Sequence, residues 1–390
     1  MSGQPPAASS RALQGFWGKG RATGTTGGGL VLPGGVEGEA ATACASGRAY
    51  ASVLARVSAS RCPQEPIAAF AGGALPHTIL SCCQGALLDM FNTRTVLPLR
   101  ATCKDAAAAV AGHAWEDMDT VIHGHVGSEL WVAGGFDPGQ GAWRACFPRA
   151  RCANVGQRKG EEPWENPCGR RLAVVDEDFV HFVGLRALNM RHCSLVTDAA
   201  LACLEGIHTL DMTGCSQLAI TDAGLAHLRG IHTLYMSDCS QPTITDAAFA
   251  HLRGIHTLDI SRGYFSPCLN VSDAAFAHLG GIHTLRMKFC NQATVSDAAF
   301  AHLAGIQCLD MSGCNQATIT DAAFAFLAGV HTLLMNGCSQ ATITEAALDP
   351  LAGIHALQIV NCDHAIQQAA RLRGLPVVPC TGRQWVLDEL

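Results

Sequence analysis

The ten residues Gly206-Ile207-His208-Thr209-Leu210-Asp211-Met212-Thr213-Gly214-Cys215 recur with small changes along the second half of the chain. Further copies follow at a usual spacing of 24 residues and begin at Gly230, Gly281, Gly305 and Gly329. A fixed period of this size is typical of a solenoid, in which each unit buries its apolar face only against its neighbours. The period therefore predicts a repeat fold and favours surface recognition over catalysis.

Eight regular units follow one another along this part of the chain. Their first residues are Gly184, Gly206, Gly230, Gly254, Gly281, Gly305, Gly329 and Gly353. The unit from Gly254 has 27 residues rather than 24, and its extra residues fall around positions 262–267. The last unit loses the pattern after Cys362.

Each unit opens with the alternation of a short strand. Leu210 and Met212 fall on one face, Ile207 enters from the preceding turn, and Asp211 points to the other face. We expect the first face to be buried. The second face then carries the residues that differ between units.

The rest of each unit has the pattern of a short helix. Thr221 or Asp222 offers an N-cap oxygen, and Leu225 and Leu228, three residues apart, cover the core. Cys215 lies between strand and helix, a place suited to a small residue whose weak donor meets a loop carbonyl. The chain therefore turns inward once in every unit.

The units resemble the cysteine-containing leucine-rich repeats, whose consensus is L-x-x-L-x-L-x-x-C followed by I-T-D-x-G-L-x-x-L. Residues 220–228 match the second part at every defined position, and later units place Ala248-Phe249 where it has Gly-Leu. The resemblance covers roughly residues 184–365 and implies an α/β solenoid, a horseshoe with a parallel sheet on its concave face. Eight or nine strands at ~4.8 Å would span about 40 Å, which suits a protein partner.

The composition argues against several classes of protein. Charged residues make up 15% of the 390, below the usual ~25%, so large buried surfaces are expected. The net charge of -6 argues against a general nucleic-acid binder. No run approaches ~18 apolar residues, so no membrane span is predicted.

The 19 cysteines are odd in number and follow the repeat, whereas a disulfide framework would pair them. Reduced, buried thiols and a cytoplasmic or nuclear location are therefore expected. No apolar segment of a secretory signal follows Met1. The first 36 residues are basic and lack acids, which leaves a mitochondrial transit peptide as a minor alternative.

Changes in composition divide the chain into six regions. They are a low-complexity, mostly disordered segment 1–70, a helical unit 71–118, a linker 119–146, an atypical capping repeat with a loop excursion 147–183, the repeats 184–375, and a tail 376–390 that covers the open end. In the capping repeat, Phe147, Ala150 and Cys152 have the spacing of Ile207, Leu210 and Met212 and predict its strand.

The helical unit has motifs of its own. Residues 75–80 read Leu-Pro-His-Thr-Ile-Leu, residues 97–104 read Leu-Pro-Leu-Arg-Ala-Thr-Cys-Lys, and Ala114-Trp115 follows an alanine-rich helix expected from Asp105. This order resembles an F-box, with the departures that Thr78 replaces the usual acid, Thr102 replaces Val, and no Trp closely follows Lys104.

An F-box ahead of such repeats is the order found in substrate receptors of cullin-based ubiquitin ligases. In that family the F-box docks on a Skp-type adaptor and the repeats hold the substrate. The resemblance implies an adaptor contact through Leu75, Pro76, Ile79, Leu80, Leu97 and Leu99. A small helical unit with excess apolar surface also needs a partner to cover it.

Histidines recur at two positions of the repeat and invite a metal interpretation. One row begins with His208 and His232, the other with His227 and His251. A ladder of equivalent positions supplies no closed tetrahedron, so surface histidines are the expected interpretation. Cys146, Cys152 and Cys168, with His123 and His125, form no recognised zinc spacing and leave only a weak alternative.

Binding specificity is expected where the units differ from one another. The candidate substrate-binding residues are Arg191, Asp211, Tyr235, Asp259, Arg262, Tyr264, Phe265, Arg286, Lys288, Asp310 and Asn336. The turn after each strand adds His192, Asp238, Phe289 and Asn361 as further variable positions. Tyr264 and Phe265 in the lengthened unit resemble a binding hot spot, and packing on a neighbouring unit is the alternative for them.

The sequence therefore predicts a non-catalytic protein without cofactor or metal. Its expected role is that of a substrate-recognition adaptor that joins a Skp-type adaptor and cullin complex to an unknown target protein. The alternative is a leucine-rich-repeat scaffold outside any ligase. A metal-dependent hydrolase using the histidines is the third and weakest reading.

Overall fold

The computed structural model describes residues 104–118, 121–122, 140–156, 174–263 and 269–379, together with Leu88, Thr93 and Val96. Two sets of predicted positions lie outside these residues. They are the adaptor-contact residues Leu75, Pro76, Ile79, Leu80, Leu97 and Leu99, and the hot-spot pair Tyr264 and Phe265.

Nine short strands form one parallel sheet in simple sequence order. The strands are β1 Cys152–Asn154, β2 Ala187–Asn189, β3 Thr209–Asp211, β4 Thr233–Tyr235, β5 Thr257–Asp259, β6 Thr284–Arg286, β7 Cys308–Asp310, β8 Thr332–Leu334 and β9 Ala356–Gln358. Every strand pairs with the same position of its neighbour, as Leu210 does with Leu188 and Leu234. The predicted solenoid with a parallel sheet is confirmed.

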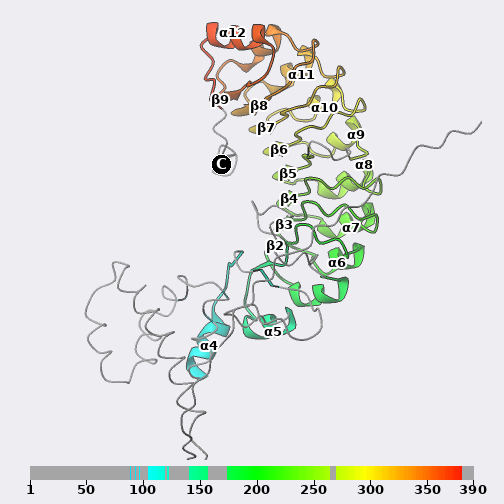
Figure 1. Ribbon diagram of the computed structural model, residues 1–390, viewed down its shortest axis with the longest axis vertical. Helices are drawn as coiled ribbons and strands as arrows, with labels where there is room; N and C mark the ends of the chain where they lie inside the picture. Colours follow the sequence, from blue (N-terminus) through cyan, green and yellow to red (C-terminus); the bar gives the residue numbers. More distant parts are fainter. Residues whose placement is uncertain are drawn as a thin grey trace, which may run out of the picture. The chain divides into compact units, whose positions relative to one another are not determined.

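Short helices return the chain from each strand to the next. The α-helices are α4 Lys104–Gly112, α5 Gln140–Cys146, α6 Asp198–Ala202, α7 Asp222–Leu225, α8 Asp246–Phe249, α9 Asp273–Phe276, α10 Asp297–Ala301, α11 Asp321–Phe324 and α12 His364–Leu372. The 3-10 helices are η2 Asp176–Phe182, η3 Ala226–Leu228, η4 Ala250–Leu252, η5 Ala325–Leu327 and η6 Glu345–Leu351. Figure 1 shows the strands on the inner side of the curved stack and α6 to α11 on its outer side. None of the helices in the described ranges has the length and apolar character needed to cross a bilayer.

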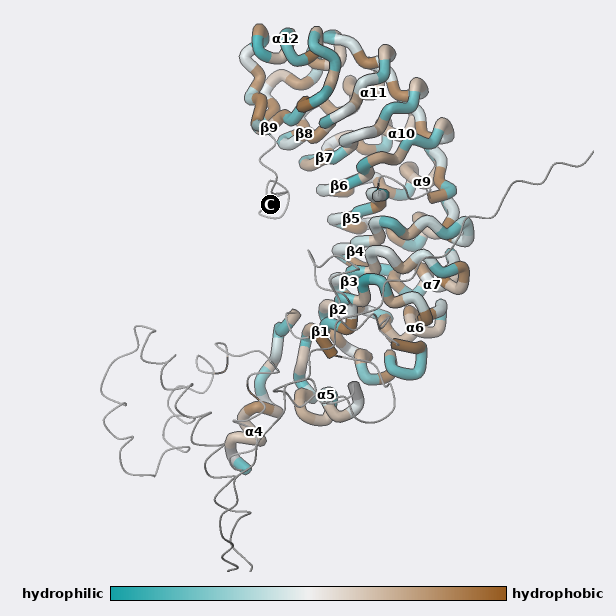
Figure 2. The backbone as a smooth tube through the Cα atoms, viewed as in Figure 1, coloured by the Kyte–Doolittle hydropathy of each residue, from teal (hydrophilic) through white to brown (hydrophobic). Residues whose placement is uncertain are grey.

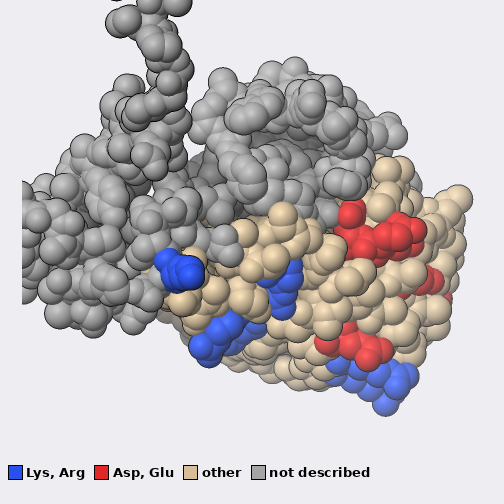
Figure 3. All heavy atoms as spheres, turned by 90° about the horizontal axis from the view of Figure 1, so that it is seen from below, with Lys and Arg blue, Asp and Glu red and all other residues tan. Residues whose placement is uncertain are grey.

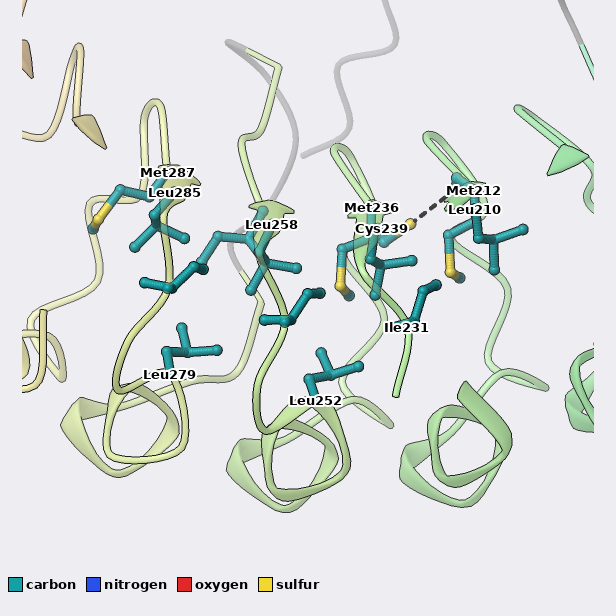
Figure 4. Close-up of a cluster of buried hydrophobic side chains, with 14 of the residues drawn as sticks. Leu210, Met212, Ile231, Met236, Cys239, Leu252, Leu258, Leu279, Leu285 and Met287 are labelled. Atoms are coloured by element: carbon teal, nitrogen blue, oxygen red, sulfur yellow. Dashed lines mark hydrogen bonds between the residues drawn. The ribbon is translucent and has the colours of Figure 1, made fainter. Parts of the chain in front are cut away.

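The core lies between the sheet and the helices and runs through all units. Leu210 and Met212 of one unit are fully buried, as are Leu258 and Leu285 further along. Figure 4 shows these side chains in successive layers, with Leu252 and Leu279 reaching the same core from the helical side. Figure 2 shows the matching alternation of hydrophobic and hydrophilic segments along each turn. Burial of each large apolar side chain is worth about 1.5–3 kcal/mol, and the repeat supplies several in every unit.

The repeated cysteine ties each unit to the one before it. The Sγ of Cys239 donates to the carbonyl of Met212 at 3.2 Å, and Cys215 does the same to Met190 at 3.2 Å. The expectation that this thiol meets a carbonyl is confirmed, and the carbonyl belongs to the strand end of the preceding unit. Burial raises the pKa of the Cys215 thiol to about 12, so this thiol stays protonated and unreactive at neutral pH.

A second link between units runs along the helical side. The Thr245 hydroxyl accepts from the Ala247 N–H and so caps α8, which decides between the two N-cap residues proposed from the sequence. The aspartate after each cap has a different role: Asp222 accepts the Thr245 N–H and the Thr245 hydroxyl, each at 2.7 Å. Equivalent pairs are Asp176–Thr197, Asp198–Thr221, Asp246–Ser272, Asp273–Ser296, Asp297–Thr320 and Asp321–Thr344.

The first strand corrects one sequence prediction. Ala153 of β1 pairs with Leu188, so Ala150, Ala153 and Val155 occupy the core positions of a unit. The predicted set Phe147, Ala150 and Cys152 is wrong by three residues. The same i, i+3, i+5 spacing of small or apolar residues occurs in both registers, and the sequence gives no further signal between them.

The N-terminal end of the sheet is covered by aromatic side chains. Trp143, Phe147 and Phe182 are buried and lie in tilted contact, with ring centroids about 6 Å apart. The Trp115 carbonyl accepts the Arg151 N–H at 2.7 Å, which holds the chain after α4 against β1. Residues 104–118 thus pack directly on the first unit.

At the other end the chain pairs with the last strand. The Leu357 N–H donates to Pro376 at 3.0 Å, and the Val378 N–H donates to Leu357 at 2.8 Å. Both main-chain groups of Leu357 that face outward are satisfied by this segment.

Candidate binding surface at the carboxyl ends and open face of the strands

The last residues of the strands form one continuous row across the sheet. The register places side by side Asn189, Asp211, Tyr235, Asp259, Arg286, Asp310, Leu334 and Gln358. Parallel pairing without shifts brings these variable positions together, so neighbours are about 4.8 Å apart. Eight of the predicted substrate-binding residues lie here: Asp211, Tyr235, Asp259, Arg286 and Asp310 in the row, and Arg191, Lys288 and Asn336 two positions after it.

Arg191 and Asp211 pair with each other at the N-terminal end of the row. The Arg191 Nη1 and the Asp211 Oδ2 are 3.2 Å apart, and each side chain is 19% exposed. The other carboxylate oxygen of Asp211 accepts the Thr213 N–H. Asp211 is therefore held in place by its own unit and its neighbour.

The centre of the row is a second cluster. Arg286 lies 4.0 Å from the carboxylate of Asp259, and its guanidinium carbon is 6.0 Å from the centre of the Tyr235 ring. The Arg286 side chain is 4% exposed and that of Asp259 is 11% exposed. A buried guanidinium needs such compensation by a carboxylate and an aromatic face.

A third pair lies beside it. The Lys288 Nζ is 3.0 Å from the Asp310 Oδ2, and the Asp310 side chain is fully buried while that of Lys288 is 22% exposed. Further along, the Asn336 Nδ2 donates to the Gln358 Oε1 at 3.0 Å, and its Oδ1 accepts the Val360 N–H at 2.9 Å.

The variable residues therefore contact one another across the sheet, which the sequence did not reveal. They form pairs one unit apart, because the register aligns residues that are 20 to 27 positions apart in the chain. Arg262 also contacts the following unit: its side chain donates to the Phe289 carbonyl, and its N–H donates to the Lys288 carbonyl at 3.0 Å. Their role toward a partner stays a prediction.

Charge on the described surface is divided into small areas. Figure 3 shows basic and acidic side chains in several small groups on the face that it views, with one acidic group adjoining a basic group. Among the described residues on that face, neither sign of charge dominates.

The strand-side histidines form a stack. The rings of His208, His232, His256 and His283 follow one another with centroids 4.4 Å apart and planes within 13° of parallel. Each Nδ1 lies 3.1–3.2 Å from the hydroxyl of the threonine that follows it. Gln307 takes the next position, and His331 and His355 continue beyond it.

This stack is a poor chelate. Imidazole lone pairs lie in the plane of the ring, so rings stacked with centroids 4.4 Å apart and nearly parallel planes do not direct two nitrogens toward one point between them. Within the described residues no group of three His, Cys, Asp or Glu side chains is arranged to hold a metal ion. Burial lowers the pKa of His232, and the neighbouring His256 and His208 lower it further.

The weak zinc alternative near the N-terminal cap falls only partly within the described residues. Cys146 is half-buried at the end of α5, and Cys152 is buried in β1. Burial raises the pKa of the Cys152 thiol. Cys168, His123 and His125 lie outside the described residues.

The position three residues after the strand has a left-handed backbone in most of the units. Phe289 has φ 56°, and His192, Asp238 and Asn361 have φ of 58–60° at the same position of other units. Gly313 and Gly337 occupy it in the two units after Phe289, with φ of 70° and 69°. A left-handed conformation is ordinary for glycine and uncommon for a bulky aromatic residue.

The two glycines leave a depression at the rim of the sheet. Its volume is about 530 Å³, and its side-chain lining includes Arg262, Phe289, Asn291, Asn315, Asn336 and Asn361. Sequence reasoning selected some of these residues and missed Asn291, Asn315 and the glycine pair. A signal for the two asparagines was present, because the units from Gly281 and Gly305 have Cys-Asn after the strand where four other units have Cys-Ser, as at Cys215-Ser216 and Cys239-Ser240.

No family model and no curated relative matches the chain. Similar solved structures include a chain of the TLR13–ssRNA13 complex, 16% identical over 56% of this chain and 34% of the other, with a TM-score of 0.44. Internalin C2 of Listeria monocytogenes is 20% identical over 53% of this chain and 84% of the other, with a TM-score of 0.36. The leucine-rich repeat domain of the type III effector XopL is 17% identical over 51% and 70%, with a TM-score of 0.37.

The match to the first of these structures spans about a third of its length. The strand register, the parallel sheet and the hydrogen bonds of the cysteines and aspartates between units are features of this chain's own structure and do not depend on these similarities. The region from β1 to β9 is a leucine-rich-repeat solenoid with its sheet on the concave face.

Proposed function

We propose that the protein is a non-catalytic substrate-recognition adaptor of a cullin-based ubiquitin ligase. Its repeats bind a target protein through the open face of the sheet, and its helical unit docks on a Skp-type adaptor. Such a protein accelerates a reaction by raising the effective concentration of the target beside a charged enzyme.

The observation that carries the protein-binding part is the row of variable side chains on the sheet. Constant residues serve the core and the interunit ladders, as Cys239 and Asp222 do. Variation is concentrated at positions such as Asp211, Tyr235 and Arg286, which share one face. A preorganised polar face of this size suits a protein surface.

The ligase part is supported by motif order and by a contact between the end of the helical unit and the first strand. The F-box-like motifs of residues 75–104 lie ahead of the repeats in the chain. The end of that unit is anchored: the Trp115 indole N–H donates to the Val110 carbonyl at 2.8 Å, and the Trp115 carbonyl accepts from Arg151 in the first repeat. The end of the helical unit therefore contacts the first unit of the solenoid.

Co-purification tests the ligase part. The full chain is expected to capture a Skp-type adaptor, and Ile79→Glu with Leu80→Glu is expected to abolish the capture. Leu218→Glu is the matched control, because Leu218 is 65% exposed on the solenoid and lies far along the chain from the motif. Absence of adaptor from the wild-type complex would overturn the ligase role.

The second candidate is a protein-binding scaffold outside any ligase. The departures at Thr78 and Thr102 from the F-box pattern favour it. Both candidates predict that Arg191→Glu weakens capture of a concave-face partner, and that Arg191→Glu with Asp211→Arg restores part of it by reversing the ion pair. Adaptor capture by the wild-type chain separates the two candidates.

A further inference from the structure

The rim depression has a floor made of main chain. Gly313 and Gly337 lie in adjacent units between Phe289 and Asn361, and neither contributes a side chain. The Gly313 N–H donates to the Asn336 carbonyl and the Gly337 N–H to the Val360 carbonyl, each at 2.7 Å. Since these N–H groups are engaged, a ligand in the depression meets side-chain groups on its walls.

The asparagines on the outer wall present hydrogen-bond donors. The Asn291 Oδ1 accepts the Asn315 N–H, and the Asn315 Oδ1 accepts the Ser339 N–H at 2.7 Å. A main-chain N–H requires an oxygen acceptor, so both amides are fixed with their Nδ2 groups turned away from these bonds, and the Asn315 Nδ2 makes a long hydrogen bond of 3.4 Å to the Gly313 carbonyl. Asn291 and Asn315 are exposed.

Among the described residues, the one charged side chain that lines the depression is also a hydrogen-bond donor. Arg262 lines the depression, and no aspartate or glutamate is among its lining residues. A lining with amide donors and a guanidinium but no carboxylate side chain favours a ligand rich in acceptor oxygens.

Phe289 supplies the apolar end wall under backbone strain. Its ring is half-buried and extends over Gly313, and its φ is 56°. Bulky residues in this conformation are strained and cluster at functional sites. Other units have Gly, Asp, Asn, His or Arg at this position, so the repeat fold does not require an aromatic side chain here.

We infer that this depression binds a short, extended, acidic peptide segment of a partner protein, with an apolar side chain placed against Phe289. Peptide carbonyls and carboxylates are acceptors that suit the donor-rich wall, whereas sugar hydroxyls donate as often as they accept. From Phe289 to Asn361 the rim spans three strand spacings, about 14 Å, which accommodates about four extended residues. The inference rests on the protein-binding part of the proposed function and is independent of adaptor docking.

Filling the depression tests the inference without disturbing the core. Gly337→Asn introduces a side chain over the floor, where a Cβ meets nothing within 4 Å. Asn361 shows that asparagine accepts this backbone conformation, with φ 60°. Gly353→Asn is the matched control, because Gly353 also has positive φ and open space around its Cβ but does not line the depression.

The probe is a displayed library of random nine-residue peptides, selected on the full-length protein. Selected peptides are synthesised and their Kd measured by fluorescence anisotropy for wild type and both variants. We expect enrichment of peptides that combine Asp or Glu with an apolar residue. We also expect about tenfold weaker binding to Gly337→Asn and unchanged binding to Gly353→Asn.

Three results would overturn the inference. The first is no enrichment of acidic residues over the unselected library, and the second is equal affinity for Gly337→Asn and wild type. The third is binding of neutral glycans on an array that Gly337→Asn removes. Failure to capture a Skp-type adaptor leaves all three readouts unaffected, so the two proposals fail separately.

Discussion

The carboxylate of Asp222 accepts both the main-chain N–H and the hydroxyl of Thr245, one repeat further along the chain, at 2.7 Å each. The same threonine hydroxyl accepts the N–H of Ala247 and so caps the next helix. In most units one Thr-Asp or Ser-Asp dipeptide therefore both starts a helix and fixes the position of the following unit. In the unit from Gly329 Glu345 replaces the aspartate, and the following unit from Gly353 lacks the equivalent threonine for it to bond.

Removing one link of this ladder is expected to destabilise the solenoid. Asp222→Ala leaves the Thr245 N–H and hydroxyl without their charged acceptor, which costs about 1–2 kcal/mol at this half-exposed site. Glu345→Ala is the control and is expected to change stability by less than about 0.5 kcal/mol. Urea unfolding followed by circular dichroism measures the free energy of unfolding of both variants. An equal loss of stability in both would contradict a stabilising role for the Asp–Thr hydrogen bonds between units.

Phe289 and Gly313 are coupled by contact. A Cβ on Gly313 would approach the Phe289 ring far inside van der Waals distance, at a position that already has φ 70°. Gly313→Ala is therefore expected to cost about 2–4 kcal/mol, of which the left-handed backbone contributes about 1–2.

Two further variants separate these causes. Gly337→Ala has the same backbone conformation and open space, so it is expected to lose only the backbone part. In a Phe289→Gly background, Gly313→Ala is expected to cost no more than Gly337→Ala. A double-mutant cycle measures the coupling, and a coupling energy near zero would show that the ring is not the cause.

The histidine stack predicts that stability falls in mild acid. Burial and the adjacent imidazoles lower the pKa of His232, and burial and His256 lower that of His283. The folded state thus favours the neutral rings. As pH falls through the unfolded value of about 6.5, the unfolded chain takes up protons first and the free energy of unfolding declines.

Glutamine variants test this linkage. His232→Gln and His256→Gln copy Gln307, which occupies the same position of another unit. They are expected to flatten the pH dependence of urea midpoints between pH 8 and pH 5. His302→Gln, at an exposed helical position outside the stack, is the control. An unchanged slope in the double variant would refute the role of the stack.

The buried cysteines are expected to resist alkylation in the folded protein. Burial raises the pKa of the Cys338 thiol to about 12 and raises that of Cys314 well above its usual range. Cys203 is half-buried and is expected to react faster with iodoacetamide at pH 8. Peptide mapping by mass spectrometry reads each site, and modification of Cys314 as fast as that of Cys203 would contradict its burial.

The repeat made most of the fold predictable from the chain alone. Leu210 and Met212, set two apart and returning every 24 residues, define both the strand and the side of the sheet that is buried. The first strand was misplaced because Ala150 and Cys152 mimic that spacing as well as Ala153 and Val155 do. The position of the first strand is defined by the pairing of Ala153 with Leu188, which is seen only in the structure.

The candidate surface was predictable only as a set of positions. That Arg191, Asp211, Lys288 and Asp310 vary between units is visible in the sequence. That they form two ion pairs depends on the register, which places side chains of successive units within 3.2 Å of each other. Likewise, the Asn291 and Asn315 amides are oriented by N–H groups of the neighbouring unit.

The sequence by itself thus determined the architecture, because a solenoid repeats local rules of strand, turn and helix that each unit satisfies with its own residues. Only the tertiary structure decided which polar groups remain for a partner. Stacking brings residues about 24 positions apart to one strand spacing, and hydrogen bonds between units then consume some donors and acceptors and leave others, as along the rim from Phe289 to Asn361.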